Sequence, residues 1–251
     1  MPYIDLNCDL GESFGAYTIG MDEKVIPFIT SANVACGFHA GDPLVMQRTV
    51  ALCKQSGVAV GAHPGFPDLQ GFGRRQMKLT PAEAKACVQY QIGALKAFCD
   101  AAGVPLHHVK SHGALYNMAG KDRALADAIC VAVKESAPGA VLLALSGSEM
   151  VKAAQAIGLP VANEVFADRG YRPDGSLVPR GTPGAMIEDE DEAIARVIRM
   201  VTEGKVTAND GTDIAIQADS VCVHGDGPKA LAFVEKIGAA LQAAGVELKA
   251  F

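Results

Sequence analysis

The chain has 251 residues, 49% of them hydrophobic, and a formal net charge of −6. This length is typical of an α/β barrel built as one domain around a large core. Lys and Arg are scattered along the chain rather than clustered, which argues against a nucleic-acid partner. Apolar runs are far shorter than the ~20 residues that cross a bilayer, and no basic segment precedes an apolar stretch at the N-terminus. We therefore expect no membrane span and no secretory signal.

The cysteines indicate a reducing compartment. There are seven of them, an odd number without regular spacing, and no C-x-x-C pair occurs. This pattern argues against a disulfide framework and against a thiolate zinc site. Cys53, Cys87, Cys99 and Cys130 lie in apolar helical stretches, where cysteine acts as a small buried hydrophobe. The expected location is the cytoplasm.

Short β-rich runs alternate with amphipathic helical segments along the whole chain. Several runs are apolar on successive residues, as in parallel strands that are covered on both faces. Strands are expected at residues 3–8, 32–36, 58–62, 108–111, 141–145, 160–166 and 220–223. Such alternation favours a single α/β domain, either a barrel or a doubly wound sheet.

Helix boundaries carry clear signals. Asp42 followed by Pro43 reads as an N-cap with proline at the first helical position. Residues 80–83, Thr-Pro-Ala-Glu, read as a capping box. Glycines follow the expected helices, where a left-handed C-terminal residue is favoured; they are Gly57, Gly103, Gly158 and Gly245. One long irregular stretch, residues 168–186, is rich in Gly, Pro and Arg, which predicts a lid or binding loop.

Polar residues cluster just after the expected strands. In barrels of this kind, active sites form at the carboxyl ends of the strands. Four histidines lie there, each beside a glycine or one residue from it, and glycine lets the backbone approach a ligand closely. The candidate residues are Asn7, Asp9 and Glu12; Asn33 and His39; His63; Lys110, His112 and Asn117; Glu164, Asp168 and Arg169; and His224 and Asp226.

Each candidate also has a structural interpretation. A single histidine after a strand is usually structural, but four at equivalent strand ends, with acids beside them, favour function. Asp9 and Glu12 are either a capping pair or a metal or proton-transfer pair. Lys110 is costly to bury unless it is paired, which predicts a charged contact to a carboxylate or phosphate.

Other residues are interpreted mainly as structural. Asp42 is first a helix cap, with ligand contact as the alternative, and Asp226 can cap the final helix. Cys36 is interpreted as a buried strand cysteine, although a nucleophile is the alternative. His107 and His108 are placed at the entry end of their strand as structural residues.

Two familiar motifs are absent. Residues 225–230, Gly-Asp-Gly-Pro-Lys-Ala, lack the spacing of a P-loop, and no G-x-S-x-G elbow occurs. Any nucleotide site would therefore be of another kind.

Five segments together resemble the LamB/YcsF family: IDLNCDLGESFG, ANVACGFHAGDP, VGAHPGFPD, VKSHGALYN and EVFADRGYRPDGSLVPR. The resemblance implies a distorted seven-stranded β/α barrel, like those of glycoside hydrolases and polysaccharide deacetylases. It also implies the A subunit of an ATP-dependent 5-oxoprolinase, which converts 5-oxoproline, ATP and water to L-glutamate, ADP and phosphate. Two partner subunits, B and C, are implied as well. Mg²⁺ would accompany the ATP.

This resemblance suggests roles for the candidates. Asp9, Glu12 and His63 would position or deprotonate water, while His39 and His112 would polarise the lactam or donate to its ring nitrogen. Contacts to phosphate or carboxylate are assigned to Lys110, Arg169 and Arg180. The remaining expected binding residues are Asn7, Asn33, Asn117, Glu164, Asp168, Tyr171, His224 and Asp226.

Two alternatives stay open. In the first, the protein is a metal-dependent, deacetylase-like hydrolase with Asp9, His63 and His112 as metal ligands. In the second, it is a non-catalytic subunit that binds ligand or regulates its partners. The oligomeric state, including a homo-oligomer, is also open.

Overall fold

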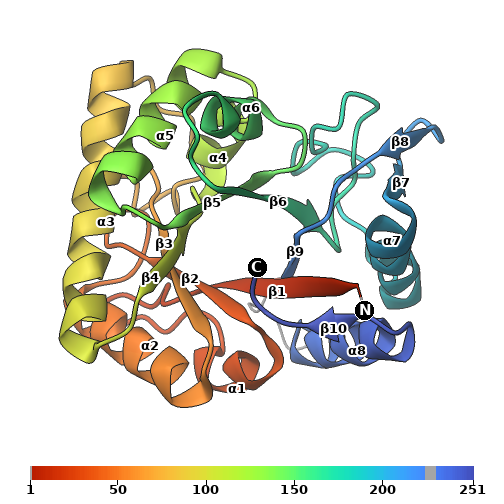
Figure 1. Cartoon of the computed structure of the whole chain (residues 1–251), viewed down its shortest axis with the longest axis horizontal. Helices are drawn as coiled ribbons and strands as arrows, with labels where there is room; N and C mark the ends of the chain where they lie inside the picture. Colours follow the sequence, from red (N-terminus) through yellow and green to blue (C-terminus); the bar gives the residue numbers. More distant parts are fainter. Residues whose placement is uncertain (1, 224–229) are drawn as a thin grey trace.

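The strands close into a barrel. The computed structural model describes residues 2–223 and 230–251. Seven parallel strands form a ring in which β1 pairs with both β2 and β9, and Figure 1 looks onto this ring. These strands are β1 (Tyr3–Leu10), β2 (Ser31–Ala35), β3 (Ala59–His63), β4 (Leu106–Val109), β5 (Val141–Leu145), β6 (Val161–Phe166) and β9 (Ser220–Val223). The expected seven-stranded β/α barrel is confirmed.

Helices cover the outside of the ring (Figure 1). Their apolar faces pack on the outward-facing strand residues in one continuous core. The helices are α1 (Asp22–Val25), α2 (Pro43–Ser56), α3 (Pro81–Ala102), α4 (Gly113–Ala119), α5 (Arg123–Ser136), α6 (Glu149–Ala156), α7 (Glu190–Glu203) and α8 (Ala230–Ala243), with a 3₁₀ turn, η1, at Ile26–Phe28. Within the described ranges, no helix is both long and apolar enough to cross a membrane.

The predicted helix ends are confirmed. The Asp42 carboxylate accepts hydrogen bonds from the amides of Leu44 and Val45, both at 2.9 Å. Thr80 and Glu83 form the reciprocal capping box of α3. The four predicted glycines all have positive φ angles, between 65° and 78°. Local side-chain chemistry is enough to set these boundaries.

The structure corrects some strand predictions. The strand predicted at residues 108–111 spans Leu106–Val109, so Lys110 lies just beyond β4 rather than inside it. The pairing of β3 with β4 shifts register between Val60 and Gly61, which displaces β4 along its neighbour. Three short strands were not predicted: the hairpin of β7 (Lys205–Thr207) and β8 (Asp213–Ala215), and β10 (Glu247–Leu248) beside β1. Two or three residues are too few to show a periodicity.

The inside of the barrel is polar, unlike the apolar layers of many barrels. Along β1, Ile4, Leu6 and Cys8 belong to the apolar core outside the ring, whereas Asp5, Asn7 and Asp9 alternate with them and contact other strands. The lowest of these, Asp5, accepts hydrogen bonds from hydroxyl groups on β2 and β9. Buried polar groups require such partners. The alternation therefore builds a hydrogen-bonded column that ends at the carboxyl end of β1.

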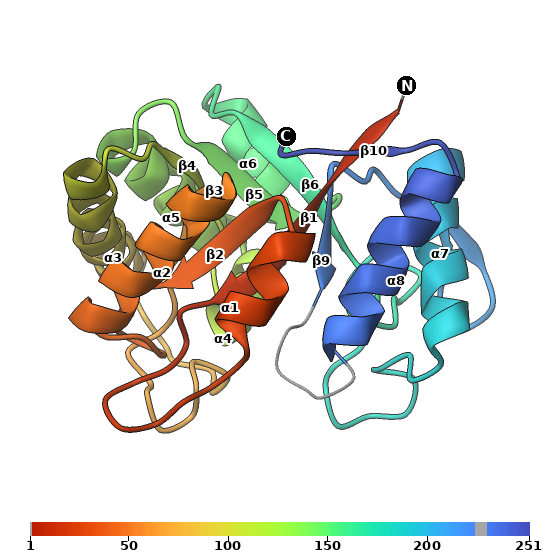
Figure 2. The ribbon, with the colours of Figure 1, turned by 90° about the horizontal axis from the view of Figure 1, so that it is seen from below.

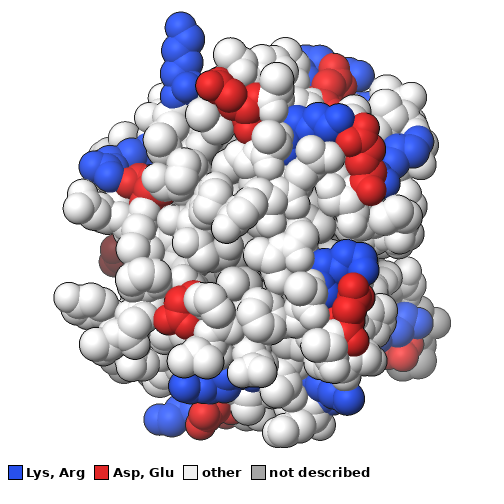
Figure 3. Space-filling view, turned by 90° about the vertical axis from the view of Figure 1, so that its left-hand side faces the viewer, with Lys and Arg blue, Asp and Glu red and all other residues white. Residues whose placement is uncertain are grey.

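The loops that follow the strands gather at one edge of the molecule. Figure 2 shows the loops after β1, β3 and β6 at the lower edge, opposite the N-terminus. The side that carries α3, shown in Figure 3, is mainly uncharged at its centre, and its basic and acidic side chains lie next to each other. Lys96 and Asp100, four residues apart on α3, form one such ion pair. The polar functional groups are instead concentrated at the loop edge.

Candidate active site

A cavity of about 830 Å³ opens at the carboxyl ends of the strands. Asp9, Glu12, His63, Lys110 and His112 line it together, as expected from their places after strands. These residues come from three strand ends that the closed ring brings together. The walls are formed by the loops after β1, β3, β5 and β6 and by α4.

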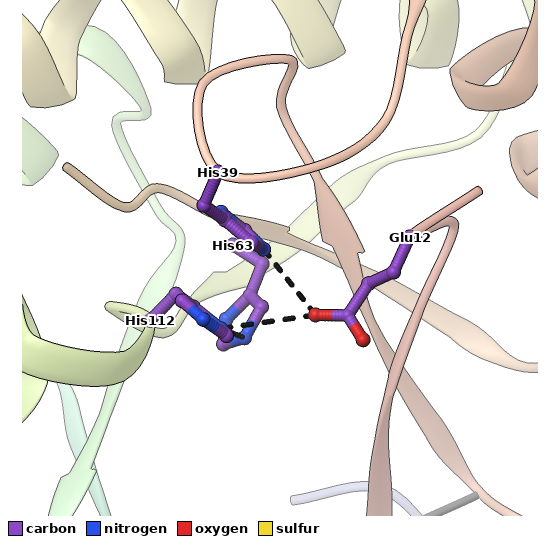
Figure 4. A group of neighbouring side chains, drawn as sticks. All are labelled: Glu12, His39, His63 and His112. Atoms are coloured by element: carbon purple, nitrogen blue, oxygen red, sulfur yellow. Dashed lines mark hydrogen bonds and ion pairs between the residues drawn. The ribbon is translucent and has the colours of Figure 1, made fainter. Parts of the chain in front are cut away.

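Three histidines and one carboxylate converge at this cavity. One ligand atom from each of Glu12, His39, His63 and His112 lies within 4.8 Å of the others. Figure 4 shows the three imidazoles facing the Glu12 carboxylate. The rings of His39 and His112 are stacked with centroids 3.7 Å apart, and His63 meets both edge-on. We call these four residues the histidine cluster.

Backbone carbonyls set the tautomers of two imidazoles in the cluster. Nδ1 of His63 lies 2.8 Å from the Lys110 carbonyl oxygen, and Nε2 of His112 lies 2.8 Å from the Phe72 carbonyl oxygen. A carbonyl only accepts, so both nitrogens carry a proton. The other two nitrogens, Nε2 of His63 and Nδ1 of His112, face each other at 3.0 Å. Asp9 Oδ2 lies 3.2 Å from Nε2 of His63.

The backbone is shaped to permit this packing. A Cβ atom at Gly73 would lie 2.8 Å from both Cδ2 of His112 and Cβ of His39. Phe72 beside it has a φ of +53°, a conformation that residues with a side chain seldom adopt. The strained Phe72 carbonyl is the one that orients His112. The turn after β3 therefore positions the cluster.

Lys110 is at the centre of a second network, below the cluster. Its ammonium group lies 3.0 Å from Asp9 Oδ1, 3.1 Å from Asn7 Oδ1 and 2.6 Å from Glu164 Oε1. Glu164 also accepts a 2.6 Å hydrogen bond from the Tyr116 hydroxyl. Lys110 is only 3% exposed, and the paired carboxylates offset the cost of burying its charge.

The surroundings of each titratable group in the site determine whether it is charged or neutral. Burial alone would raise the pKa of Asp9, but His63 and Lys110 hold that pKa well below its usual value. Burial alone would lower the pKa of Lys110, but Asp9, Cys222 and Glu164 raise it well above normal. Burial and the neighbouring His63 lower the pKa of His112 to about 3. At neutral pH the site therefore holds an ionised Asp9–Lys110 pair beside a neutral His112.

Other predicted residues support the site from below. Asn33 donates to both Asn7 and Asp9 and accepts a hydrogen bond from His108. The two asparagines are fully buried and do not line the cavity. Asn33 holds the Asp9 carboxylate in place, and Asn7 contacts Asn33 and Lys110. His108 acts in the same layer, which agrees with its interpretation as a structural residue.

Residues predicted from the long loop divide into two groups. Arg169 and Arg180 line the cavity, as does Asn117 on α4. The Arg169 guanidinium donates to the carbonyls of Ala185 and Val178, so it also ties the loop together. Besides Asn7 and Asn33, four predicted residues within the described ranges do not line the cavity: His39, Glu164, Asp168 and Tyr171. His224 and Asp226 lie outside the described residues.

The irregular stretch at residues 168–186 forms one wall of the cavity. It is held by short bridges between Arg169 and Met186 and between Tyr171 and Leu177. The Tyr171 hydroxyl accepts a hydrogen bond from the Phe166 amide, which anchors the loop to the end of β6. Residues 174–180 then face the cavity. The loop is therefore anchored to the barrel at one end and exposed to the cavity along residues 174–180, as a binding loop should be.

The motifs around this cavity are shared with known proteins. The family model described as the LamB/YcsF family matches residues 4–251. The chain belongs to the LamB/YcsF family. It is 64% identical to the 5-oxoprolinase A subunit of Clostridium beijerinckii, covering 98% of this chain and 96% of the relative. It is 58% identical to the 5-oxoprolinase A subunit of Bacillus subtilis, with the same coverage of both chains.

Solved structures agree with the fold. The lactam utilization protein from Thermus thermophilus superposes with a TM-score of 0.94 at 51% identity, covering 99% of this chain and 100% of that one. A family 4 carbohydrate esterase from Streptomyces lividans superposes with a TM-score of 0.52 at 11% identity, covering 98% of this chain and 91% of that one. The second match shows only a shared fold, as expected for a LamB/YcsF barrel.

Sequence reasoning missed several residues of the LamB/YcsF site. Arg74 lines the cavity with its guanidinium 5.1 Å from the centre of the Phe72 ring. Ser111 also lines it, and its buried hydroxyl has no hydrogen-bond partner among the described residues. Tyr116 lines the cavity as well, and its hydroxyl donates to Glu164. The glycines beside Phe72 mark the turn that carries Arg74, and they are the signal by which it could have been found.

Cys36 is not placed as a nucleophile. Its thiol is buried and donates to the Val34 carbonyl, and burial raises its pKa to about 12. A reactive cysteine needs a lowered pKa and access to substrate. The seven cysteines are all free thiols, and only Cys87 is more than marginally exposed. Cys53, Cys99 and Cys130 are buried as predicted.

Proposed function

We propose that this protein is the A subunit of an ATP-dependent 5-oxoprolinase, which opens the lactam ring of 5-oxoproline to L-glutamate. The observation that carries the proposal is the His63–Asp9 pair, held by Lys110 at the base of a cavity. Relatives that match almost the whole chain are named as the A subunit of 5-oxoprolinase, and a solved relative is a lactam utilization protein.

A lactam carbonyl resists attack, so water must be activated. Nδ1 of His63 donates to a backbone carbonyl, which leaves Nε2 to accept a proton from water. Asp9, 3.2 Å from that nitrogen and held ionised by Lys110, stabilises the imidazolium that forms. This arrangement, a base oriented by one group and stabilised by another, is the general pattern for an activated nucleophile.

The rest of the cavity suits an anionic substrate. Arg74 and Arg180 line the walls and can bind the carboxylate of 5-oxoproline or a phosphate. The unpartnered hydroxyl of Ser111 can donate to the lactam oxygen. Lys110 already contacts three oxygen atoms, so its role here is to hold Asp9 and Glu164.

ATP enters the proposal through the weakness of the electrophile. Transfer of the γ-phosphoryl group to the lactam oxygen, with ADP as the leaving group, would remove amide resonance and expose C5 to water. Addition of water at C5 would then break the C5–N bond, with the nitrogen taking a proton, and a second water would release phosphate from the acyl phosphate that remains. Mg²⁺ would accompany the nucleotide through its phosphates. Because no P-loop is present, we assign the full reaction to a complex of this chain with the B and C subunits.

Reconstitution with those two subunits tests the proposal. We expect 5-oxoproline-dependent ATP hydrolysis and glutamate formation with all three chains together. Asp9→Asn and His63→Ala should each lower turnover by at least ~100-fold while the fold stays intact. His107→Gln, at the opposite end of β4, is the matched control and should leave turnover unchanged. Near-normal turnover in both site variants would favour the non-catalytic alternative.

A further inference from the structure

We propose that the histidine cluster is a binding site for one divalent transition-metal ion. The ligands are Nε2 of His63, Nδ1 of His112, Nε2 of His39 and a carboxylate oxygen of Glu12. The inference goes beyond lactam opening and does not depend on it, because it rests only on the arrangement of these four side chains.

The first argument is the orientation of His63 and His112. Each donates its other ring N–H to a backbone carbonyl at 2.8 Å. The two remaining nitrogens, 3.0 Å apart, then both present lone pairs when the rings are neutral. Two lone pairs at this distance repel each other unless a cation or a proton lies between them. Metal-bound histidines commonly donate their second N–H to a carbonyl or carboxylate in this way.

The second argument is convergence. A shared proton would involve only two nitrogens, whereas Glu12 and His39 also bring a ligand atom to the same place, with all four atoms within 4.8 Å of one another (Figure 4). The Glu12 oxygen lies 3.3 Å from Nε2 of His39 and 3.8 Å from Nδ1 of His112. Ligands about 2.1 Å from a tetrahedral ion lie roughly 3.4 Å from each other. The separations between the ligand atoms of this cluster, 3.0, 3.3 and 3.8 Å, lie on either side of that value.

The ligand set also selects the class of metal. Three imidazoles and one carboxylate suit Zn²⁺, Co²⁺ or Fe²⁺, whereas Mg²⁺ prefers oxygen ligands. Asp9 Oδ2 lies 3.2 Å from the same nitrogen of His63, but Lys110 and Asn33 hold the other Asp9 oxygen on the side of the second network. The set therefore differs from the Asp9, His63 and His112 triad considered from the sequence.

The site would be open to substrate on one side. Glu12, His63 and His112 line the cavity, whereas His39 lies behind them. A fifth position facing the cavity would be available to water or to a carbonyl oxygen. With an ion bound, Nε2 of His63 would be a ligand rather than the base, and the ion would instead lower the pKa of bound water or polarise a carbonyl.

Metal binding by the full chain tests the proposal without ATP, 5-oxoproline or partner subunits. Protein stripped with a chelator would be titrated with Zn²⁺ and with Co²⁺ alone, by calorimetry and by visible absorption. We expect one equivalent per chain and a cobalt spectrum without thiolate bands. His112→Gln and Glu12→Gln should each weaken binding at least ~10-fold. His107→Gln, which removes a histidine outside the cluster, should bind like the unaltered protein.

Circular dichroism establishes that each variant is folded, and Glu12→Gln provides the test if His112→Gln unfolds. The proposal is overturned if the unaltered chain binds well under one equivalent. It is equally overturned if both cluster variants bind as tightly as the control, or if thiolate bands appear. Loss of metal binding with lactam turnover intact would remove this site and leave the proposed function standing.

Discussion

The conformation of single residues in the turn after β3 decides whether the histidines can meet. Gly73 has a φ of +62°, and a Cβ atom there would press on His39 and His112. Gly57, at the end of α2, has a similar φ of +67° but open space around the missing Cβ. The two glycines therefore share the same backbone requirement and differ only in their side-chain neighbours.

This pair gives a residue-scale prediction. Gly57→Ala should cost roughly 1 kcal/mol of folding free energy, the penalty for a left-handed backbone. Gly73→Ala should cost more and should also displace the stacked rings, which we expect to lower turnover by 10-fold or more. Chemical denaturation and steady-state turnover would measure the two effects. Equal losses of turnover in both variants would show that packing against the rings is unimportant.

At the scale of elements, the ends of the helices are locally encoded. The capping box of α3 satisfies backbone amides with the side chains of Thr80 and Glu83, without help from the rest of the fold. The capping pair is exposed and far along the chain from the cluster residues. Its contribution should therefore be to stability alone.

Replacing Thr80 tests this separation. Thr80→Ala should lower the free energy of unfolding by about 1 kcal/mol, because it leaves the Glu83 amide without its partner. Thr80→Ser, which keeps the hydroxyl, should recover most of the loss. Both variants should retain full turnover at a temperature where they are folded. A fall in turnover for folded Thr80→Ala would contradict a purely structural role.

At the scale of the whole molecule, the polar interior of the barrel links stability to pH. His108 is fully buried among β-strand residues, with its Nε2 at 2.8 Å from the Asn33 side-chain oxygen. Burial, followed by the neighbouring charges of His107 and Lys110, lowers its pKa well below the usual value. The native protein therefore keeps His108 neutral under conditions in which the unfolded chain protonates it.

The sign of the effect follows from proton binding. Below about pH 6.5 the unfolded chain binds a proton that the native state does not, so stability falls as the pH decreases. Above that pH both states have a neutral His108 and the effect disappears. His108→Gln, which can still donate to Asn33, should have a shallower loss of stability between about pH 7 and pH 5. Denaturant titrations at several pH values measure this, and parallel curves would contradict it.

Local sequence determined the ends of the helices, the order of the elements and the edge of the barrel where the site lies. Asp42, the Thr80 capping box and the C-terminal glycines mark helix ends through contacts within a few residues. The order of strands and helices predicted the barrel, and the places of Asp9, His63 and His112 after strands predicted a shared edge. These inferences succeed because periodicity and capping depend on near neighbours.

The tertiary structure alone decided how those residues meet. Asn7 and Glu164 look like ligand contacts in the sequence, yet closure of the ring turns them inward to hold Lys110. Arg74 enters the cavity because the turn after β3 folds back over His39 and His112. The stacking of those two rings and the direction of each imidazole N–H depend on backbone carbonyls far away in sequence. Such contacts arise from three-dimensional packing, which no local pattern in the chain records.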